Sequence, residues 1–269
     1  FMSSRAIGIV SGKGGVGKTT LTANLGAALA KYFEKRVLIV DCNLTTSHLG
    51  LSLGIYYSPL TLNQLLKYGK VKKNLEFETY LPNLCVLPAS ISLKELKGVN
   101  VMKLRSLINK LKKLEFDFIL LDSAPGLGRE AMATLKASEE VIFVSNPLTI
   151  AAIDLIRLNE IIAKLGIVSI GLVLNMVRKK SYELKEEEIE SFVNLPIIGK
   201  IPYDKNVLRA LALKAPVVLK FPKSKASKAF LKVAERITQE KILMESEKSI
   251  YDILASKIRF LLQKIKKFK

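Results

Sequence analysis

Short apolar runs alternate along this chain with segments in which apolar residues recur every third or fourth position. The runs are typical of strands buried on both faces of a sheet, and the recurrences are typical of helices packed against that sheet. The pattern therefore predicts an α/β fold, with a doubly wound, mostly parallel sheet that carries helices on both faces. Predicted strands cover 6–10, 36–41, 83–90 (broken by Pro88), 116–122, 140–144, 168–174 and 197–201.

The predicted helices lie between these strands. One begins at Lys18, and others cover 60–68, 101–114, 151–165 and 183–193, with Gly69 placed to end the second. No internal repeat or low-complexity linker interrupts this part of the chain. We therefore expect one domain over residues 1–244, followed by a separate segment, 245–269.

The C-terminal segment consists of a polar spacer, 245–248, and an amphipathic stretch, 249–269. In this stretch apolar residues recur at i, i+3 and i+4, cations lie opposite, and Asp252 is the one acid. A basic amphipathic helix of this kind is typical of an interfacial membrane anchor. A core helix of the domain and a coiled-coil seam between two chains remain the alternatives.

A glycine-rich segment joins the first predicted strand to the first predicted helix. It fits the pattern G-x-x-x-x-G-K-[ST], in which glycines let consecutive amides curl around phosphate oxygens. The dipole of the following helix favours the same anion. We predict a P-loop, with its lysine on the β- and γ-phosphates and the next hydroxyl on Mg²⁺. The expected nucleotide-binding residues are Gly12, Lys13, Gly14, Gly15, Val16, Gly17, Lys18, Thr19 and Thr20.

Two other predicted strands end in aspartate, at Asp41 and Asp122. In a parallel sheet both would reach the edge at which the P-loop lies. We assign Asp122, which closes a continuous apolar run, to Mg²⁺ together with Thr19. A simple strand-end cap is the alternative for Asp122 taken alone. The irregular stretch after Asp41 predicts a ligand-facing loop, and we interpret His48 as a loop residue within it.

The segment 13–20 resembles the deviant Walker A box of the MinD/ParA ATPases, and 201–204, 207–210 and 215–218 resemble the MinD branch of that family. The resemblance spans about residues 5–240 and implies ATP and Mg²⁺ as cofactors. It implies that Lys13 reaches across a dimer interface to the nucleotide of the partner subunit. It also implies a nucleotide contact at Pro202 and an adenine contact at Asn175, which from the sequence alone could equally begin a turn.

The chain departs from the family pattern in two loops. The family's D-x-D has Asn43 at its second position, and 122–126 reads D-S-A-P-G where D-S-P-A-G is usual. An amide can hold a water molecule but cannot accept its proton, so we expect slow ATP hydrolysis. The expected catalytic residues are Lys13, Lys18, Asp41, Asn43 and Asp122.

Composition adds a constraint on partners. The formal net charge of +19 predicts affinity for polyanions, either nucleic acid or an anionic membrane, although a lysine-rich solvated surface is the plainer interpretation. Two cysteines without a C-x-x-C motif exclude a cysteine-only metal or iron–sulfur site within one chain. No apolar run approaches the roughly 18 residues of a membrane span, and we expect a cytoplasmic protein.

Together these features predict an ATP-dependent switch. We expect a homodimer in the ATP state that attaches reversibly to the inner face of the cell membrane through residues 249–269. Its expected role is to position a division complex or another large assembly through an unidentified regulatory or cargo protein. The alternatives are a ParA-like partition ATPase that binds DNA through its basic surface, an iron–sulfur scaffold, and a module that retains ATP without hydrolysing it.

Overall fold

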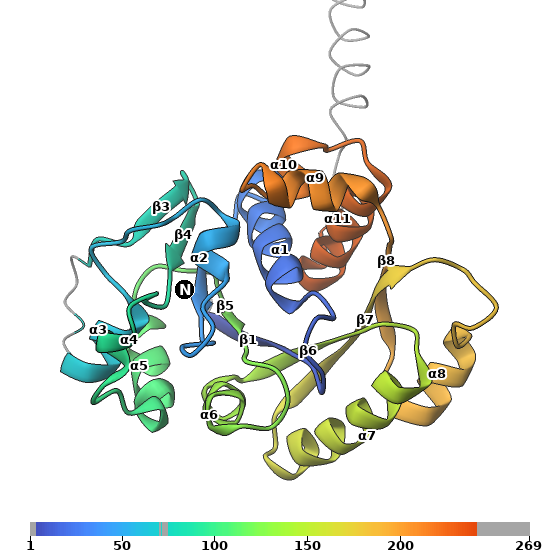
Figure 1. Cartoon of the computed structure of the whole chain (residues 1–269), viewed down its shortest axis with the longest axis horizontal. Coiled ribbons are helices and arrows are strands. Elements are labelled where there is room, and N and C mark those ends of the chain that lie inside the picture. Colours follow the sequence, from blue (N-terminus) through green and yellow to red (C-terminus); the bar gives the residue numbers. More distant parts are fainter. Residues whose placement is uncertain (1–3, 70, 72–74, 241–269) are drawn as a thin grey trace, which may run out of the picture.

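The computed structural model describes residues 4–69, 71 and 75–240, and these residues form an α/β sandwich around one sheet (Figure 1). The sheet has eight strands in the order β3-β4-β2-β5-β1-β6-β7-β8. Every neighbouring pair is parallel except β3 with β4. The strands are β1 (Arg5–Val10), β2 (Val37–Asp41), β3 (Glu78–Leu81), β4 (Leu84–Leu87), β5 (Phe118–Asp122), β6 (Glu140–Ser145), β7 (Val168–Val177) and β8 (Ile197–Pro202).

Strand β1 lies inside the sheet, hydrogen-bonded to β5 on one side and β6 on the other. Strand β2 continues the sheet beyond β5. Because these strands are parallel, the loops that follow β1, β2 and β5 leave from the same edge. The order of the strands thus brings together three segments that are far apart in the sequence.

Helices cover both faces of the sheet (Figure 1). Alternate residues of β1 divide between them: Ile7 and Ile9 pack with α1, α10 and α11, whereas Ala6 packs with α3, α5 and α6. A third cluster joins α7 and α8 to β6 and β7. The helices are α1 (Lys18–Tyr32), α2 (Leu49–Ser52), α3 (Leu62–Tyr68), α4 (Leu93–Leu96), α5 (Leu104–Leu111), α6 (Arg129–Ala137), α7 (Thr149–Lys164), α8 (Glu186–Val193), α9 (Lys205–Ala212), α10 (Val217–Lys220) and α11 (Lys225–Thr238).

The predicted fold class and most predicted elements are confirmed. Helix α3 begins after Thr61, which forms a capping box with Gln64, and it ends at Gly69 with φ of 65°. Strand β4 ends directly before Pro88, which has no amide hydrogen to donate to a ladder. These are positions at which local chemistry alone fixes a boundary.

Other predicted boundaries are wrong. The single helix expected over 101–114 is a 3₁₀ turn, Val101–Lys103, followed by the shorter α5, because Asn100 caps the turn through its bond from the Met102 amide. Strand β7 runs to Val177 and so contains Asn175, because its pairing with β8 continues to Pro202. The half-buried edge strand β3 was not predicted at all.

The predicted domain boundary near residue 244 and the amphipathic stretch 249–269 lie outside the described residues. Within the ranges that the structure describes, no helix combines the length and the apolar character needed to cross a bilayer.

Candidate functional site

The P-loop joins β1 to α1 in the conformation that its glycines permit. Gly15 and Gly17 have φ of 76° and 97°, values that residues with a side chain rarely adopt. A Cβ atom at Gly17 would also lie 2.2 Å from Nδ2 of Asn175. Glycine is therefore required at this position both by the backbone conformation and by the neighbouring strand.

Lys18 is buried at the start of α1, and its ammonium donates to Oγ of Ser11 at 2.7 Å. Ser11 in turn donates to the carbonyl of Lys13. Burial lowers the pKa of Lys18, and the nearby Asp122 carboxylate partly opposes that shift. The lysine is thus held beside the loop by one neutral hydroxyl, an interaction that a phosphate oxygen can replace with a stronger one.

The two groups predicted for Mg²⁺ are in direct contact. Oγ1 of Thr19 donates to Oδ2 of Asp122 at 2.6 Å, and Thr22 bonds the other carboxylate oxygen at 3.3 Å. Burial, and to a lesser extent the neighbouring Asp41, raise the pKa of Asp122, whereas Thr19 and Lys18 lower it, and the net pKa is about 7. A buried carboxylate beside a hydroxyl is a donor set that suits Mg²⁺, which takes few protein ligands and completes its shell with phosphate and water.

Asp41 lies opposite Asp122 on the neighbouring strand. It is fully buried, and burial raises its pKa to about 6 against the bonds from Ser47 and from the Asn43 and Leu49 amides, which lower it. Both of its oxygens are used by the loop that follows β2. Its predicted catalytic role stays a prediction, and its contacts in the structure organise the loop.

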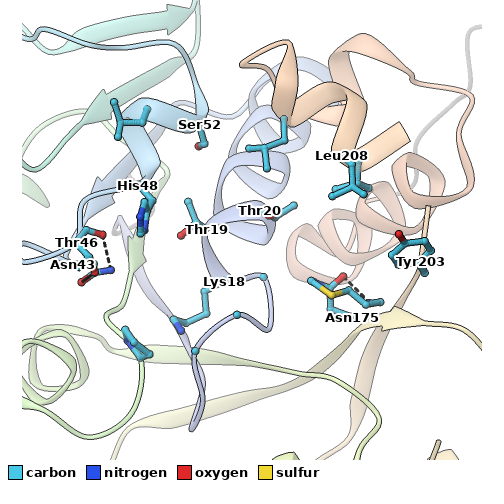
Figure 2. A pocket seen from close by; sticks show the side chains of 18 of the residues that line it. Lys18, Thr19, Thr20, Asn43, Thr46, His48, Ser52, Asn175, Tyr203 and Leu208 are labelled. Carbon is cyan, nitrogen blue, oxygen red and sulfur yellow. Dashed lines mark hydrogen bonds between the residues drawn. The ribbon is translucent and has the colours of Figure 1, made fainter. Parts of the chain in front are cut away.

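Asn43 lines the cavity beside the P-loop, at the position expected for the water-holding residue. Its side chain closes a turn of its own loop: Nδ2 donates to the carbonyl of Thr46 at 2.8 Å, and the Thr46 hydroxyl donates to Oδ1 at 3.1 Å (Figure 2). Both polar ends of the amide are therefore occupied by Thr46 in this conformation.

Asn175 and Pro202, which the family resemblance placed at the nucleotide, line the same cavity as the P-loop. Nδ2 of Asn175 donates to the carbonyl of Val16 at 2.8 Å, and Oδ1 accepts from the Met176 amide (Figure 2). Asn175 lies within β7 and does not begin a turn. Its side chain fastens the P-loop to this strand, and one amide hydrogen remains for a ligand.

The cavity that joins these residues has a volume of about 700 Å³, within the usual range for small-molecule sites. It extends from the P-loop between α2 and α9 (Figure 2). The sequence did not predict the part of the cavity lining that comes from α2 and α9, because an exposed apolar residue on a helix carries no signal of its own. The missed lining residues are Leu51, Ser52, Met176, Tyr203, Asp204, Val207, Leu208, Leu211 and Lys214, whereas Thr46, Ser123 and Pro125 lie in the two loops that follow the aspartate-ended strands.

Two further side chains, those of His48 and Tyr203, line the cavity. His48 lies in the loop before α2, as predicted, and it is exposed at the cavity wall. Tyr203 is stacked under the guanidinium of Arg178, whose central carbon lies 3.7 Å from the ring centre. This pair stiffens the end of the cavity formed by Asn175 and Pro202.

Lys13 stands apart from the other predicted site residues. It is exposed, and no described residue forms a hydrogen bond or ion pair with its ammonium group. The structure thus brings Lys18, Thr19, Asp41, Asn43 and Asp122 together around the P-loop and leaves Lys13 pointing to no partner within the described chain.

Comparison with known proteins places these features in a family. Residues 7–217 match the model of the CobQ/CobB/MinD/ParA nucleotide binding domain. An uncharacterised ATP-binding protein of Methanocaldococcus jannaschii is 33% identical over 232 residues, which cover 86% of this chain and 87% of the relative.

Two solved structures are similar over almost their whole length. The cell division ATPase MinD of Pyrococcus furiosus superposes with a TM-score of 0.83 at 35% identity, covering 88% of this chain and 99% of that one. The septum site-determining protein MinD of Pyrococcus horikoshii, solved with Mg-ADP, gives a TM-score of 0.82 at 33% identity, covering 87% and 96%.

Replacing Asp122 with asparagine should stabilise the nucleotide-free protein, and more so at high pH. Because burial raises the pKa of the folded-state carboxyl to about 7 from 3.8, the wild-type protein loses stability as the pH rises from about 4 to about 7, and asparagine removes this loss. The gain should be on the order of 4 kcal/mol near pH 8, at about 1.4 kcal/mol per pKa unit, and should shrink toward pH 4.5. Urea unfolding in EDTA without nucleotide measures it.

Asp204→Asn serves as a control of opposite sign. Partial burial raises the pKa of Asp204, but the bonds from the Asn206 and Ala226 amides outweigh it and the net shift is downward. Its contribution is present at neutral pH and is lost as the pH falls, so Asp204→Asn should cost stability near pH 8. An Asp122→Asn gain that did not change with pH would contradict this account.

Proposed function

The chain belongs to the MinD/ParA family of nucleotide-binding proteins, and from that premise we propose that it is an ATP-dependent switch that works with Mg²⁺. One observation carries the proposal: Lys18 and Thr19 line a cavity large enough for a nucleotide, and Thr19 donates to the buried Asp122 behind it. The Mg-ADP complex of the similar Pyrococcus horikoshii protein supports it. Loss of measurable ATP binding by calorimetry in Lys18→Ala, but not in Lys136→Ala on the outer side of α6, tests it.

The residues of the site would contact different parts of the nucleotide. The amides of Gly14 to Thr19 would hold the phosphates, and Lys18 would exchange the Ser11 hydroxyl for a phosphate oxygen. Thr19 and Asp122 would hold Mg²⁺, which neutralises phosphate charge when bound. Asn175 and Pro202 would face the base.

We assign the remaining cation, Lys13, to a second copy of the chain. Its exposed ammonium has no partner among the described residues, yet it sits at the start of a phosphate-binding loop. A charge placed there would gain a partner if another protomer brought its own nucleotide against this face. ATP would then be required for dimer formation, because the phosphates are what the lysine binds.

Lys13→Gln should abolish ATP-dependent dimer formation while ATP affinity stays within about 3-fold of wild type. Removing one partner of a desolvated charge pair typically costs about 2–5 kcal/mol, so the dimer should weaken at least ~30-fold. Sedimentation velocity with Mg²⁺ and a non-hydrolysable ATP analogue measures the dimer, and calorimetry measures the affinity. A dimer that persists in Lys13→Gln would rule out this role.

We propose that the switch resets slowly. Asn43 occupies the position of an expected carboxylate, and its amide can orient a water molecule but cannot accept the proton that the water loses. The ATP-bound state would then be long-lived, and a regulatory partner would set its lifetime.

Asn43→Asp should raise steady-state turnover by at least ~10-fold, since a positioned general base typically contributes a factor of 10²–10⁴. Phosphate release under saturating ATP measures the rate. Asn43→Ala is the matched control and should show no increase. An aspartate variant no faster than wild type would count against the assignment.

The C-terminal stretch 249–269 would supply the attachment to an anionic membrane on the cytoplasmic side. It lies outside the described residues, and the proposal rests on its pattern of an apolar face opposite lysines and arginine. A single such helix binds lipid weakly, and two held in one ATP dimer would bind through avidity. Attachment would therefore depend on nucleotide and would let the dimer position a division complex or another assembly.

Full-length protein should co-sediment with vesicles that contain anionic lipid when ATP is present, and the 1–248 fragment should stay in the supernatant. Leu261→Gln on the apolar face should abolish binding, whereas Lys266→Gln on the polar face should weaken it by a few-fold, in line with about 1 kcal/mol per cation. Full-length protein that remains in the supernatant under every condition would eliminate the anchor.

DNA is the second candidate partner, favoured by one surface. Arg105, Lys110 and Lys113 line a shallow groove on the exposed side of α5. DNA binding through this surface would weaken steeply with salt and would survive removal of the C-terminal stretch, unlike membrane binding.

A further inference from the structure

The loop that follows β2, residues 42–48, is held from the inside by one carboxylate. Oδ2 of Asp41 accepts from the Ser47 hydroxyl at 2.8 Å and from the Leu49 amide at 3.1 Å. Oδ1 accepts from the Asn43 amide at 3.1 Å. Both ends of the loop are therefore fixed to a single buried group at the end of the strand.

A second carboxylate holds the same loop from the outside. The exposed Thr45 hydroxyl donates to Oε1 of Glu130 at 2.5 Å. Glu130 belongs to the first turn of α6, which begins directly after the loop that follows β5. Burial raises the pKa of the Cys42 thiol, and the buried Thr134, one turn further along the same helix, lies close enough to oppose that rise in part. One face of α6 thus contacts both the start and the middle of loop 42–48.

Helix α6 connects the two loops that border the phosphate end of the cavity. Asn43 and Thr46 line it from the loop after β2, and Ser123 and Pro125 line it from the loop after β5 (Figure 2). Among the described residues, the contact between Thr45 and Glu130 is the one side-chain hydrogen bond that joins loop 42–48 to the first turn of α6. This bond therefore ties the middle of the first loop, which Asp41 holds at its two ends, to the helix that follows the second loop.

We infer that Glu130 is a positioning residue for the third phosphate: through Thr45 it holds loop 42–48 where a triphosphate, but not a diphosphate, reaches it. This inference rests on the proposed nucleotide-binding function. The α- and β-phosphates would lie within the P-loop, to which Glu130 makes no hydrogen bond or ion pair among the described residues. Loss of the bond should therefore lower affinity for the triphosphate selectively.

The test compares the Kd for Mg-ADP with that for a Mg-bound ATP analogue that cannot be hydrolysed, in full-length protein. Thr45→Val and Glu130→Ala should each weaken analogue binding about 5-fold, as expected for loss of one solvent-exposed hydrogen bond, with ADP binding within 2-fold of wild type. Thr45→Ser retains the hydroxyl and should bind both nucleotides like wild type. Because the two side chains act as one bond, the double variant Thr45→Val/Glu130→Ala should be no worse than either single variant.

Lys136→Ala, at an exposed position of the same helix, is the matched control and should change neither affinity. Equal weakening of ADP and analogue binding, additive effects in the double variant, or a Thr45→Ser defect as large as that of Thr45→Val would overturn the inference. Unchanged affinities in Glu130→Ala would overturn it as well, while leaving the proposed function intact. Wild-type protein that binds neither nucleotide would instead defeat the proposed function, and the two failures are thereby distinguished.

Discussion

Two carboxylates buried side by side, at the ends of β2 and β5, are the constraint on which the site depends. Asp41 and Asp122 face each other across one strand pairing, and burial raises the pKa of both. Charge at this position is tolerated only because hydroxyls, amides and the Lys18 ammonium surround it. The two carboxylates repel each other when both are charged. A divalent cation bound beside them would reduce this repulsion.

The contacts of these two groups also set the geometry of the surrounding loops. Asp122 holds Thr19 and thereby the first turn of α1, whereas Asp41 holds the loop after β2. On the other side of the P-loop, Asn175 donates to the Val16 carbonyl, which is possible because Gly17 has no side chain that would collide with the Asn175 amide. The P-loop and the first turn of α1 are thus attached to β5 and β7 through direct hydrogen bonds, so a change in either strand reaches this loop.

Cations are distributed according to two different requirements. Lys18 is buried and donates a hydrogen bond to Ser11, whereas Lys13, five residues earlier, is exposed and has no partner among the described residues. In the proposed function the first cation serves the chain's own nucleotide and the second serves that of another copy. That proposal rests on this difference in environment and not on the overall charge of +19.

The sequence by itself determined the sheet, the P-loop and the ends of several elements, because these follow from local chemistry. Apolar runs form buried strands, glycine permits positive φ, Gly69 ends α3, and β4 ends directly before Pro88. It also predicted that Thr19 and Asp122 lie close together, since Thr19 lies in the first turn of a helix and Asp122 ends a strand at the same edge of a parallel sheet.

Only the tertiary structure decided which side chains meet across that edge. Neither the contact between Thr45 and Glu130 nor the wall formed by Leu208 and Leu211 has a sequence signature, because each depends on how a loop or helix packs against an element distant in the chain. The same holds for Asn175: its pairing within β7, set by the neighbouring β8, brings its amide to the P-loop. The spacing of apolar residues along the chain determines the helices and strands, whereas the packing of distant segments determines which side chains are in contact.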